Sequence, residues 1–185
     1  MIKIIKIFIC LIILFMLAIP IILISIGIKI SSNGPIIHWS KRIGKNNVIF
    51  LMPKFRTMKE DTPQLASSII KDKSFITPYG KILRKLSVDE IPQLYSIIKG
   101  DMNFIGPRPA LFNQYDLIKL RNKNDLNKIL PGITGWAQVN GRDEISIEKK
   151  IDYECEYMLK KTITFDFYIL ALTFIRVFLS KDISH

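Results

Sequence analysis

The chain has 185 residues and a mass of 21.4 kDa, with 49% hydrophobic residues and a mean hydropathy of +0.24. This length allows one domain with a core of its own and is short for two. The hydropathy is high for a soluble protein and low for a multi-pass transporter. Two cysteines and two histidines exclude a disulfide framework and argue strongly against a His/Cys zinc site.

The charge balance is strongly basic, with 27 Lys and Arg against 16 Asp and Glu and a net charge of +11. The first 30 residues hold three lysines and no acid, so the remainder still carries +8, from 24 minus 16. Such an excess predicts an anionic partner, which can be a set of phosphates, a nucleic acid or an acidic membrane surface.

Residues 7–28 form an uncharged apolar run that is long enough to cross a bilayer as a helix. A cleaved signal peptide would have a shorter apolar region, and a core helix would have a polar face. Pro20 lies near the middle, where it kinks a helix, and lysines flank both ends, so the positive-inside rule gives no polarity. The pattern therefore predicts either a spanning helix or a helix that re-enters at Pro20.

The segment after the apolar run is predicted to be a β-hairpin or an extended pair of segments. A turn cluster at 31–35 ends the apolar run, and short apolar pieces follow over residues 36–52. We expect the hairpin to turn near Asn46 and Asn47 and to end at Pro53.

The central part of the chain is predicted to alternate turns and helices. A Pro-Tyr-Gly turn is expected at 78–80, and one helix over 88–99 that Gly100 ends. The Gly-Pro-Arg-Pro sequence at 106–109 indicates a rigid loop, and residues 110–129 show helical periodicity.

The C-terminal third contains a glycine-rich loop at 131–141, a charged helix at 144–160 and an apolar segment at 165–179. The last segment is too short to span a membrane comfortably. Its aromatic residues suit a membrane interface, and its apolar character equally suits a core helix. The sequence leaves these two interpretations open.

Adjacent carboxylates, Asp89 and Glu90, lie at the start of the predicted helix 88–99. Ser87 and Glu90 match the capping box S-x-x-E, so the plain interpretation is that the acids cap the helix and offset its dipole. With Asp89 as the cap instead, Pro92 falls in the favoured first turn. In either arrangement the acids lie where backbone N–H groups would also bind a phosphate.

Cations are dense around this acid pair in the sequence. Five of them are candidates for binding the phosphates of a substrate: Lys54, Arg56, Arg84, Arg108 and Arg142. Arginine suits bidentate phosphate recognition, and lysine supplies a point charge. Each could instead be a solvated surface charge, but their occurrence with Gly and Pro in loops favours a site. Acids among cations, without His or Cys, suit Mg²⁺ held by oxygen ligands and phosphates.

Four motifs carry a resemblance to a known family. They occur in the order KFRTM (54–58), LSVDEIPQL with KGDM (86–102), GPRPAL (106–111) and PGITGWAQVNGR (131–142). Over nearly its whole length the chain resembles the small monotopic phosphoglycosyl transferases of the bacterial sugar transferase family. The GPRPALFNQYDLI run is most similar to capsule-type enzymes that handle N-acetylated deoxyhexosamines.

The resemblance implies a mixed α/β fold that is mainly helical. Residues 1–30 would form a re-entrant helix-break-helix at Pro20, and residues 31–185 a compact cytoplasmic catalytic domain with interfacial helices. The enzyme would be monotopic in the bacterial inner membrane. Family members usually have Ser-Pro at the break, whereas this chain has Ile19-Pro20, so a hydroxyl group that could cap the broken turn is missing.

The resemblance also implies a reaction and roles for individual residues. The family transfers a phospho-sugar from a UDP-sugar to undecaprenyl phosphate and releases UMP, in the first membrane step of capsule, O-antigen, exopolysaccharide or glycan assembly. Asp89 would be the nucleophile and a Mg²⁺ ligand, with Glu90 as its partner. Lys54, Arg84 and Arg108 would contact phosphates.

Other classes of function remain possible from the residues alone. A membrane-anchored nucleic-acid-binding module would explain the charge, but it gives the acid pair and the rigid Gly-Pro loops no role, so we expect no nucleic-acid partner. A metal-dependent phosphohydrolase could use the same acids. It would release free sugar phosphate without needing a polyprenol acceptor.

Overall fold

The computed structural model describes residues 2–60, 62, 75–141 and 145–179. The chain folds into two compact units, residues 1–40 with 52–100 and residues 41–51 with 101–184, and the β-hairpin passes from one to the other. The fold is mixed α/β and mainly helical, as expected. The expected division of the chain at residue 30, into a membrane part and a cytoplasmic part, stays a prediction.

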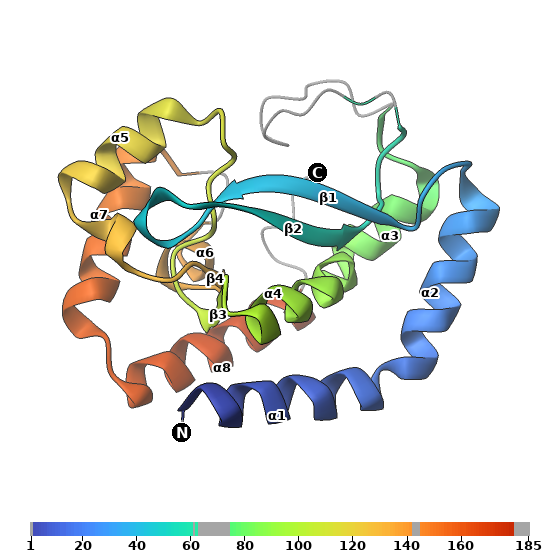
Figure 1. Cartoon of the computed structure of the whole chain (residues 1–185), viewed down its shortest axis with the longest axis horizontal. Helices are drawn as coiled ribbons and strands as arrows, with labels where there is room; N and C mark the ends of the chain where they lie inside the picture. Colours follow the sequence, from blue (N-terminus) through green and yellow to red (C-terminus); the bar gives the residue numbers. More distant parts are fainter. Residues whose placement is uncertain (1, 61, 63–74, 142–144, 180–185) are drawn as a thin grey trace. The chain divides into compact units, whose positions relative to one another are not determined.

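The N-terminal apolar segment forms two helices, α1 (Ile2–Met16) and α2 (Ala18–Ser31), bent by 62° (Figure 1). The hinge lies at Leu17, a few residues before Pro20, because proline is tolerated in the first turn of a helix but blocks the turn before it. Within the described residues no single helix is long and apolar enough to cross a membrane. The bent pair together meets that test by length and composition.

Both N-terminal helices pack on the first unit. Helix α1 contacts α4 (Leu94–Lys99), and α2 contacts α3 (Pro78–Lys85). Ile24 and Ile28 of α2 are buried in one core cluster with Phe55 and Leu83. The outward faces of α1 and α2 remain apolar and exposed.

The predicted hairpin is confirmed as a two-stranded sheet of β1 (Ile37–Ile43) and β2 (Ile49–Phe55). Asn46 and Asn47 form the turn with φ of 54° and 61°, in the left-handed region that asparagine tolerates. The expectation that Pro53 ends the hairpin is wrong, because β2 continues through it. In a two-stranded sheet both strands are edges, and an edge strand tolerates the missing N–H.

Helix α3 replaces the turn expected at 78–80. The Thr77 hydroxyl accepts a hydrogen bond from the Gly80 N–H at 2.9 Å, and Pro78 occupies the first turn, where its missing N–H costs nothing. The single helix expected over 88–99 is a 3-10 helix, η3 (Val88–Gln93), followed by α4. Gly100 ends α4 in the left-handed conformation, as expected.

In the second unit, two short strands pair in parallel, β3 (Asn103–Ile105) and β4 (Gly132–Thr134). The loop expected at 131–141 therefore contains β4 and also the short helix α6 (Trp136–Val139). The parallel pairing brings backbones together, since a Cβ on Gly132 would lie 2.2 Å from the Gly106 nitrogen. Elements of three or four residues are too short to show periodicity in a sequence.

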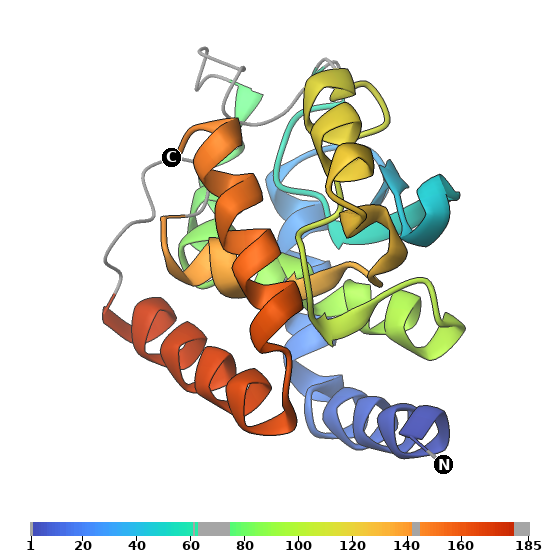
Figure 2. The same ribbon diagram turned by 90° about the vertical axis from the view of Figure 1, so that its left-hand side faces the viewer.

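The remaining helices enclose the core of this unit (Figure 2). They are α5 (Tyr115–Lys123), the 3-10 turn η4 (Leu126–Lys128), α7 (Ile147–Lys160) and α8 (Ile163–Leu179). Helix α5 starts five residues later than expected, after a turn at 112–113, and it ends at Lys123, so the single helix expected over 110–129 is wrong. Helix α8 combines the two interpretations of its sequence: Ile169 is fully buried in the core, whereas Phe167 and Phe174 are each 67% exposed.

Candidate active site

The acid pair lies on η3, between helices α3 and α4 of the first unit. Ser87 precedes η3 with φ of 55°, so the chain turns sharply before the acids. The predicted capping box is wrong, because the Ser87 side chain makes no capping hydrogen bond. Asp89 is largely buried, with 8% of its surface exposed.

Glu90 forms an ion pair with Lys54 of β2. The Lys54 Nζ lies 2.8 Å from the Glu90 Oε1, and each side chain is 16% exposed. The pair joins residues 36 positions apart in the chain. Lys54, predicted as a phosphate ligand, is therefore brought directly to the acid pair in this structure.

Arg84 lies on α3 in the same unit. Its Nε donates a hydrogen bond to the Thr57 hydroxyl at 2.9 Å, and Thr57 is itself buried. This hydrogen bond fixes the Nε of Arg84 and so limits the directions in which its two Nη atoms can point. The sequence identified Arg84 but did not identify Thr57, although Thr57 lies within the KFRTM motif.

Arg56 is bonded to the turn that follows α2. Its Nη2 donates to the carbonyl and to the hydroxyl of Ser32, at 2.8 and 2.9 Å, in the turn that follows α2. Gly34 in that turn has φ of +111°, and a Cβ there would collide with the Arg56 guanidinium. Arg56 therefore clamps the end of the apolar helix pair, and a phosphate-binding role for it stays a prediction.

Arg108 belongs to the second unit, between Pro107 and Pro109. Its backbone carbonyl accepts a hydrogen bond from the Arg121 Nη2 at 2.8 Å. Its predicted meeting with the phosphates near Asp89 stays a prediction, as does the role of Arg142, which lies outside the described residues. Sequence reasoning missed Arg121, because its partner Glu154 is 33 residues away.

Mg²⁺ at this site would depend on carboxylate oxygens as its protein ligands. The described residues contain no group of three or more His, Cys, Asp or Glu that could hold a metal ion by itself. Mg²⁺ is commonly bound by one or two carboxylates together with substrate phosphates and water. Asp89 with a bound diphosphate fits that pattern.

The chain is similar to known proteins over most of its length. The bacterial sugar transferase family matches residues 1–180. The chain is 35% identical over 156 residues to the "Uncharacterized sugar transferase EpsL" of Bacillus subtilis (strain 168), covering 84% of this chain and 76% of that protein.

Two longer relatives carry more specific names. A "UDP-glucose:undecaprenyl-phosphate glucose-1-phosphate transferase" of Xanthomonas campestris pv. campestris is 36% identical, over 83% of this chain and 34% of its own length. A "UDP-N-acetylgalactosamine-undecaprenyl-phosphate N-acetylgalactosaminephosphotransferase" of Aeromonas hydrophila is 34% identical, over 79% and 36%. The chain thus spans about a third of these two proteins.

The family match covers the apolar helix pair, the acid pair, the loop that carries Arg108 and all of α8. All four sequence motifs lie inside the matched range. The chain belongs to the bacterial sugar transferase family.

Proposed function

We propose that this chain transfers a phospho-sugar from a UDP-sugar to undecaprenyl phosphate and releases UMP, at the start of polysaccharide assembly. One observation carries the proposal: the acid pair and the bent apolar helix pair share one unit. Helix α2 packs on α3 and α1 packs on α4, and η3 with Asp89 contacts both α3 and α4. A carboxylate in this position can meet a soluble donor and a lipid acceptor.

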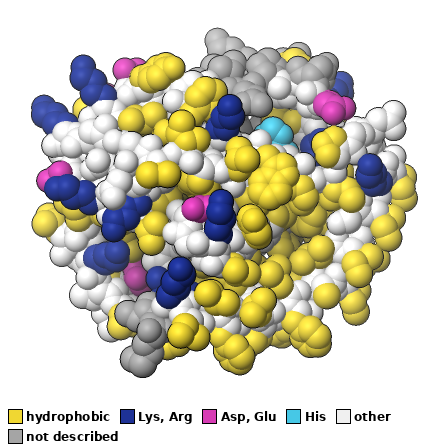
Figure 3. Space-filling model, viewed as in Figure 1, with side chains coloured by type: hydrophobic (Ala, Val, Ile, Leu, Met, Phe, Trp, Pro, Cys, Tyr) yellow, Lys and Arg dark blue, Asp and Glu magenta, His cyan; other side chains and the backbone are white. Residues whose placement is uncertain are grey.

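The membrane attachment follows from the exposed surface of α1 and α2. Large apolar side chains on these helices are more than half exposed: Ile4, Phe8, Leu11, Phe15, Ile19, Leu23, Ile26 and Ile30. Figure 3 shows such side chains along the rim where Figure 1 draws α1 and α2. Burying them in lipid is favourable, and the bend supports entry and return on the cytoplasmic face of the inner membrane.

The chemistry proceeds by two displacements at phosphorus. An Asp89 carboxylate oxygen attacks the β-phosphorus of the UDP-sugar, and the bond to the bridging oxygen breaks, so UMP leaves. An oxygen of undecaprenyl phosphate then attacks the aspartyl-phosphosugar, forms the lipid-linked diphosphate and restores the Asp89 carboxylate. The covalent step divides one difficult transfer into two easier ones.

The cations have defined tasks in this scheme. Lys54 holds the Glu90 carboxylate beside the nucleophile, and the Arg84 guanidinium, which bonds to Thr57 through its Nε, would contact a phosphate. Arg108 would contact a phosphate of the donor. Mg²⁺, held by Asp89 and the diphosphate, would neutralise the negative charge that builds up on the leaving group.

For the sugar we propose an N-acetylated hexosamine, which can also be a deoxy sugar. The resemblance of GPRPALFNQYDLI to capsule-type enzymes supports it, as does the name of the Aeromonas relative. Glucose is the competing candidate, because it appears in the name of the Xanthomonas relative.

The test uses membranes that contain the protein, with undecaprenyl phosphate and one UDP-sugar at a time. We expect UMP release and a lipid-linked product with UDP-N-acetylhexosamines, and a ³²P-labelled enzyme when the donor's β-phosphate is labelled and no acceptor is added. The Asp116→Asn variant, with its acid exposed on α5, is the matched control. Steady release of free sugar phosphate without acceptor would identify a phosphohydrolase instead.

A further inference from the structure

The loop that presents Arg108 is held by an unusual set of hydrogen bonds. Four successive carbonyls, of residues 107 to 110, each accept a hydrogen bond from a different group. The donors, in that order, are the Gly132 N–H at 2.9 Å, the Arg121 Nη2 at 2.8 Å, the Arg42 Nη1 at 3.1 Å and the Ile43 N–H at 2.9 Å. Because Pro107 and Pro109 have no N–H, these carbonyls are the main means of fixing the loop.

Arg121 donates the hydrogen bond to the carbonyl of Arg108, the residue proposed to bind phosphate. It lies on α5 and is held by Glu154 of α7 through two bonds, Nε to Oε2 at 2.8 Å and Nη2 to Oε1 at 2.6 Å. The side chains are only 10% and 2% exposed. The same Nη2 also donates to the Arg108 carbonyl, so one guanidinium links α5, α7 and the loop.

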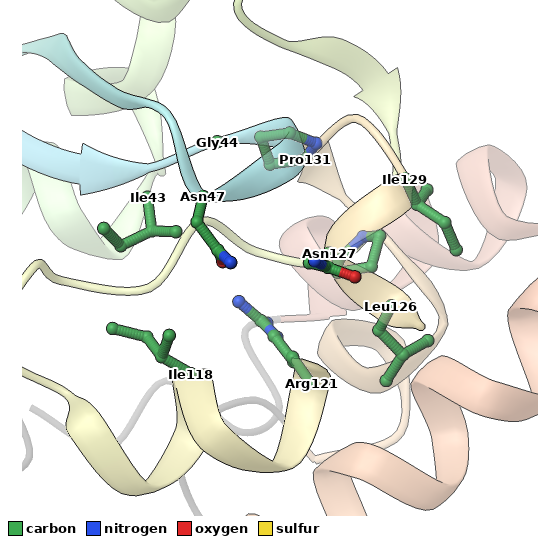
Figure 4. A pocket seen from close by; sticks show the side chains of 10 residues that line it. Ile43, Gly44, Asn47, Ile118, Arg121, Leu126, Asn127, Ile129 and Pro131 are labelled. Atoms are coloured by element: carbon green, nitrogen blue, oxygen red, sulfur yellow. The ribbon is translucent and has the colours of Figure 1, made fainter. Parts of the chain in front are cut away.

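The Arg121 side chain is only 10% exposed, so little of it can reach a substrate. It lines a cavity of about 20 Å³ together with Asn47, Asn127 and apolar residues (Figure 4). That volume holds about one water molecule, and the buried Asn127 Oδ1, which has no hydrogen-bond partner among the described residues, could accept its hydrogen bond. A nucleotide or a lipid headgroup cannot enter this space.

We propose that Arg121, held by Glu154, is a positioning residue that fixes the backbone of Arg108 for phosphate binding. The inference rests on the proposed function, since it assumes that the Arg108 side chain contacts the diphosphate. A buried ion pair adds little net stability compared with apolar residues of similar size. Its geometric effect is larger, because a displacement of about 1 Å at a reacting group can cost about a hundredfold in rate.

The test removes the ion pair without leaving a buried charge. In the double variant Arg121→Met/Glu154→Leu we expect a thermal unfolding midpoint within about 4 °C of the parent. We expect kcat/KM to fall about tenfold to a hundredfold. The shares of this loss that appear in kcat and in KM should be the same as in Arg108→Ala. The matched control is Lys128→Met, which breaks an exposed ion pair with Asp125 on η4.

A double-mutant cycle distinguishes positioning from general damage. If Arg121 acts through Arg108, the Arg121→Met/Glu154→Leu change causes no further loss in an Arg108→Ala background. A further loss of tenfold or more there, or wild-type kcat/KM in the double variant itself, would overturn the inference. Full activity of Arg108→Ala would instead contradict the phosphate role assumed for that residue.

If the double variant fails to fold, Arg121→Lys takes its place. Its kcat/KM is measured alone and in the Arg108→Ala background. Lysine keeps the charge beside Glu154, but it has no planar group whose Nε and Nη2 bond to both carboxylate oxygens of Glu154 and so fix the direction of the donor to the Arg108 carbonyl. We expect it to fold, to lose about tenfold in kcat/KM, and to lose nothing more in the Arg108→Ala background. Unchanged kcat/KM in this variant would refute the positioning role.

Discussion

The Lys54–Glu90 ion pair offers a quantitative test of how the acid pair is built. Replacing Lys54 by Met removes the cation and leaves the Glu90 carboxylate in a site where only 16% of its side chain is exposed. At 2.8 Å and an effective dielectric constant near 20, the direct attraction is about 6 kcal/mol. Most of this attraction is offset by the cost of removing both charges from water.

The expected loss lies between two measured limits. Exposed ion pairs contribute about 1 kcal/mol or less, and breaking a fully buried pair costs about 3–5 kcal/mol. Since both partners keep some exposure, we expect Lys54→Met to lower the free energy of unfolding by about 2–3 kcal/mol. Adding Glu90→Gln to Lys54→Met removes the negative charge of Glu90, and we expect it to restore most of the lost free energy of unfolding.

The assay is urea unfolding of four proteins in the same detergent: the parent, Lys54→Met, Glu90→Gln and the double variant. Their cycle gives the coupling free energy between the two side chains. Lys81→Met, on the exposed face of α3, controls for the loss of any single lysine. A double variant that is no more stable than Lys54→Met would refute the reasoning, because the loss of stability would then not depend on the Glu90 charge.

Three further outcomes are expected. Asp89→Asn should abolish transfer and ³²P-labelling while the circular dichroism spectrum is unchanged; a tenth of the parent rate would exclude the nucleophile role. Arg108→Ala should lower kcat/KM by a hundredfold or more, and Arg108→Lys should recover only part of it, because lysine lacks the planar fork; full recovery would show that no bidentate contact exists. A cysteine at position 2, in a Cys10→Ser background, should resist an impermeant thiol reagent in intact cells and become labelled after Pro20→Leu straightens the segment. Labelling with Pro20 intact would place the N-terminus outside.

Features that depend on a residue and its immediate neighbours were predictable from the sequence. The bend of the apolar segment, the hairpin turn and the end of α4 follow from Pro20, the Asn46-Asn47 pair and Gly100, whose allowed backbone angles differ from those of other residues. The motifs also identified the acid pair and Lys54, which the structure pairs with Glu90. One local pattern gave a wrong prediction. The capping-box sequence is present at Ser87, but the Ser87 side chain makes no capping hydrogen bond.

Contacts between distant residues were decided only by the tertiary structure. The pairing of β3 with β4 joins two strands too short to leave a pattern, and the assignments of Lys54 to Glu90, Arg56 to Ser32 and Arg121 to Glu154 span 36, 24 and 33 residues. An isolated basic residue in a sequence has the same appearance whether it binds a phosphate, clamps a turn or supports a loop. Packing selects among these roles, because a buried cation must find its acceptors among the groups that the fold brings within reach.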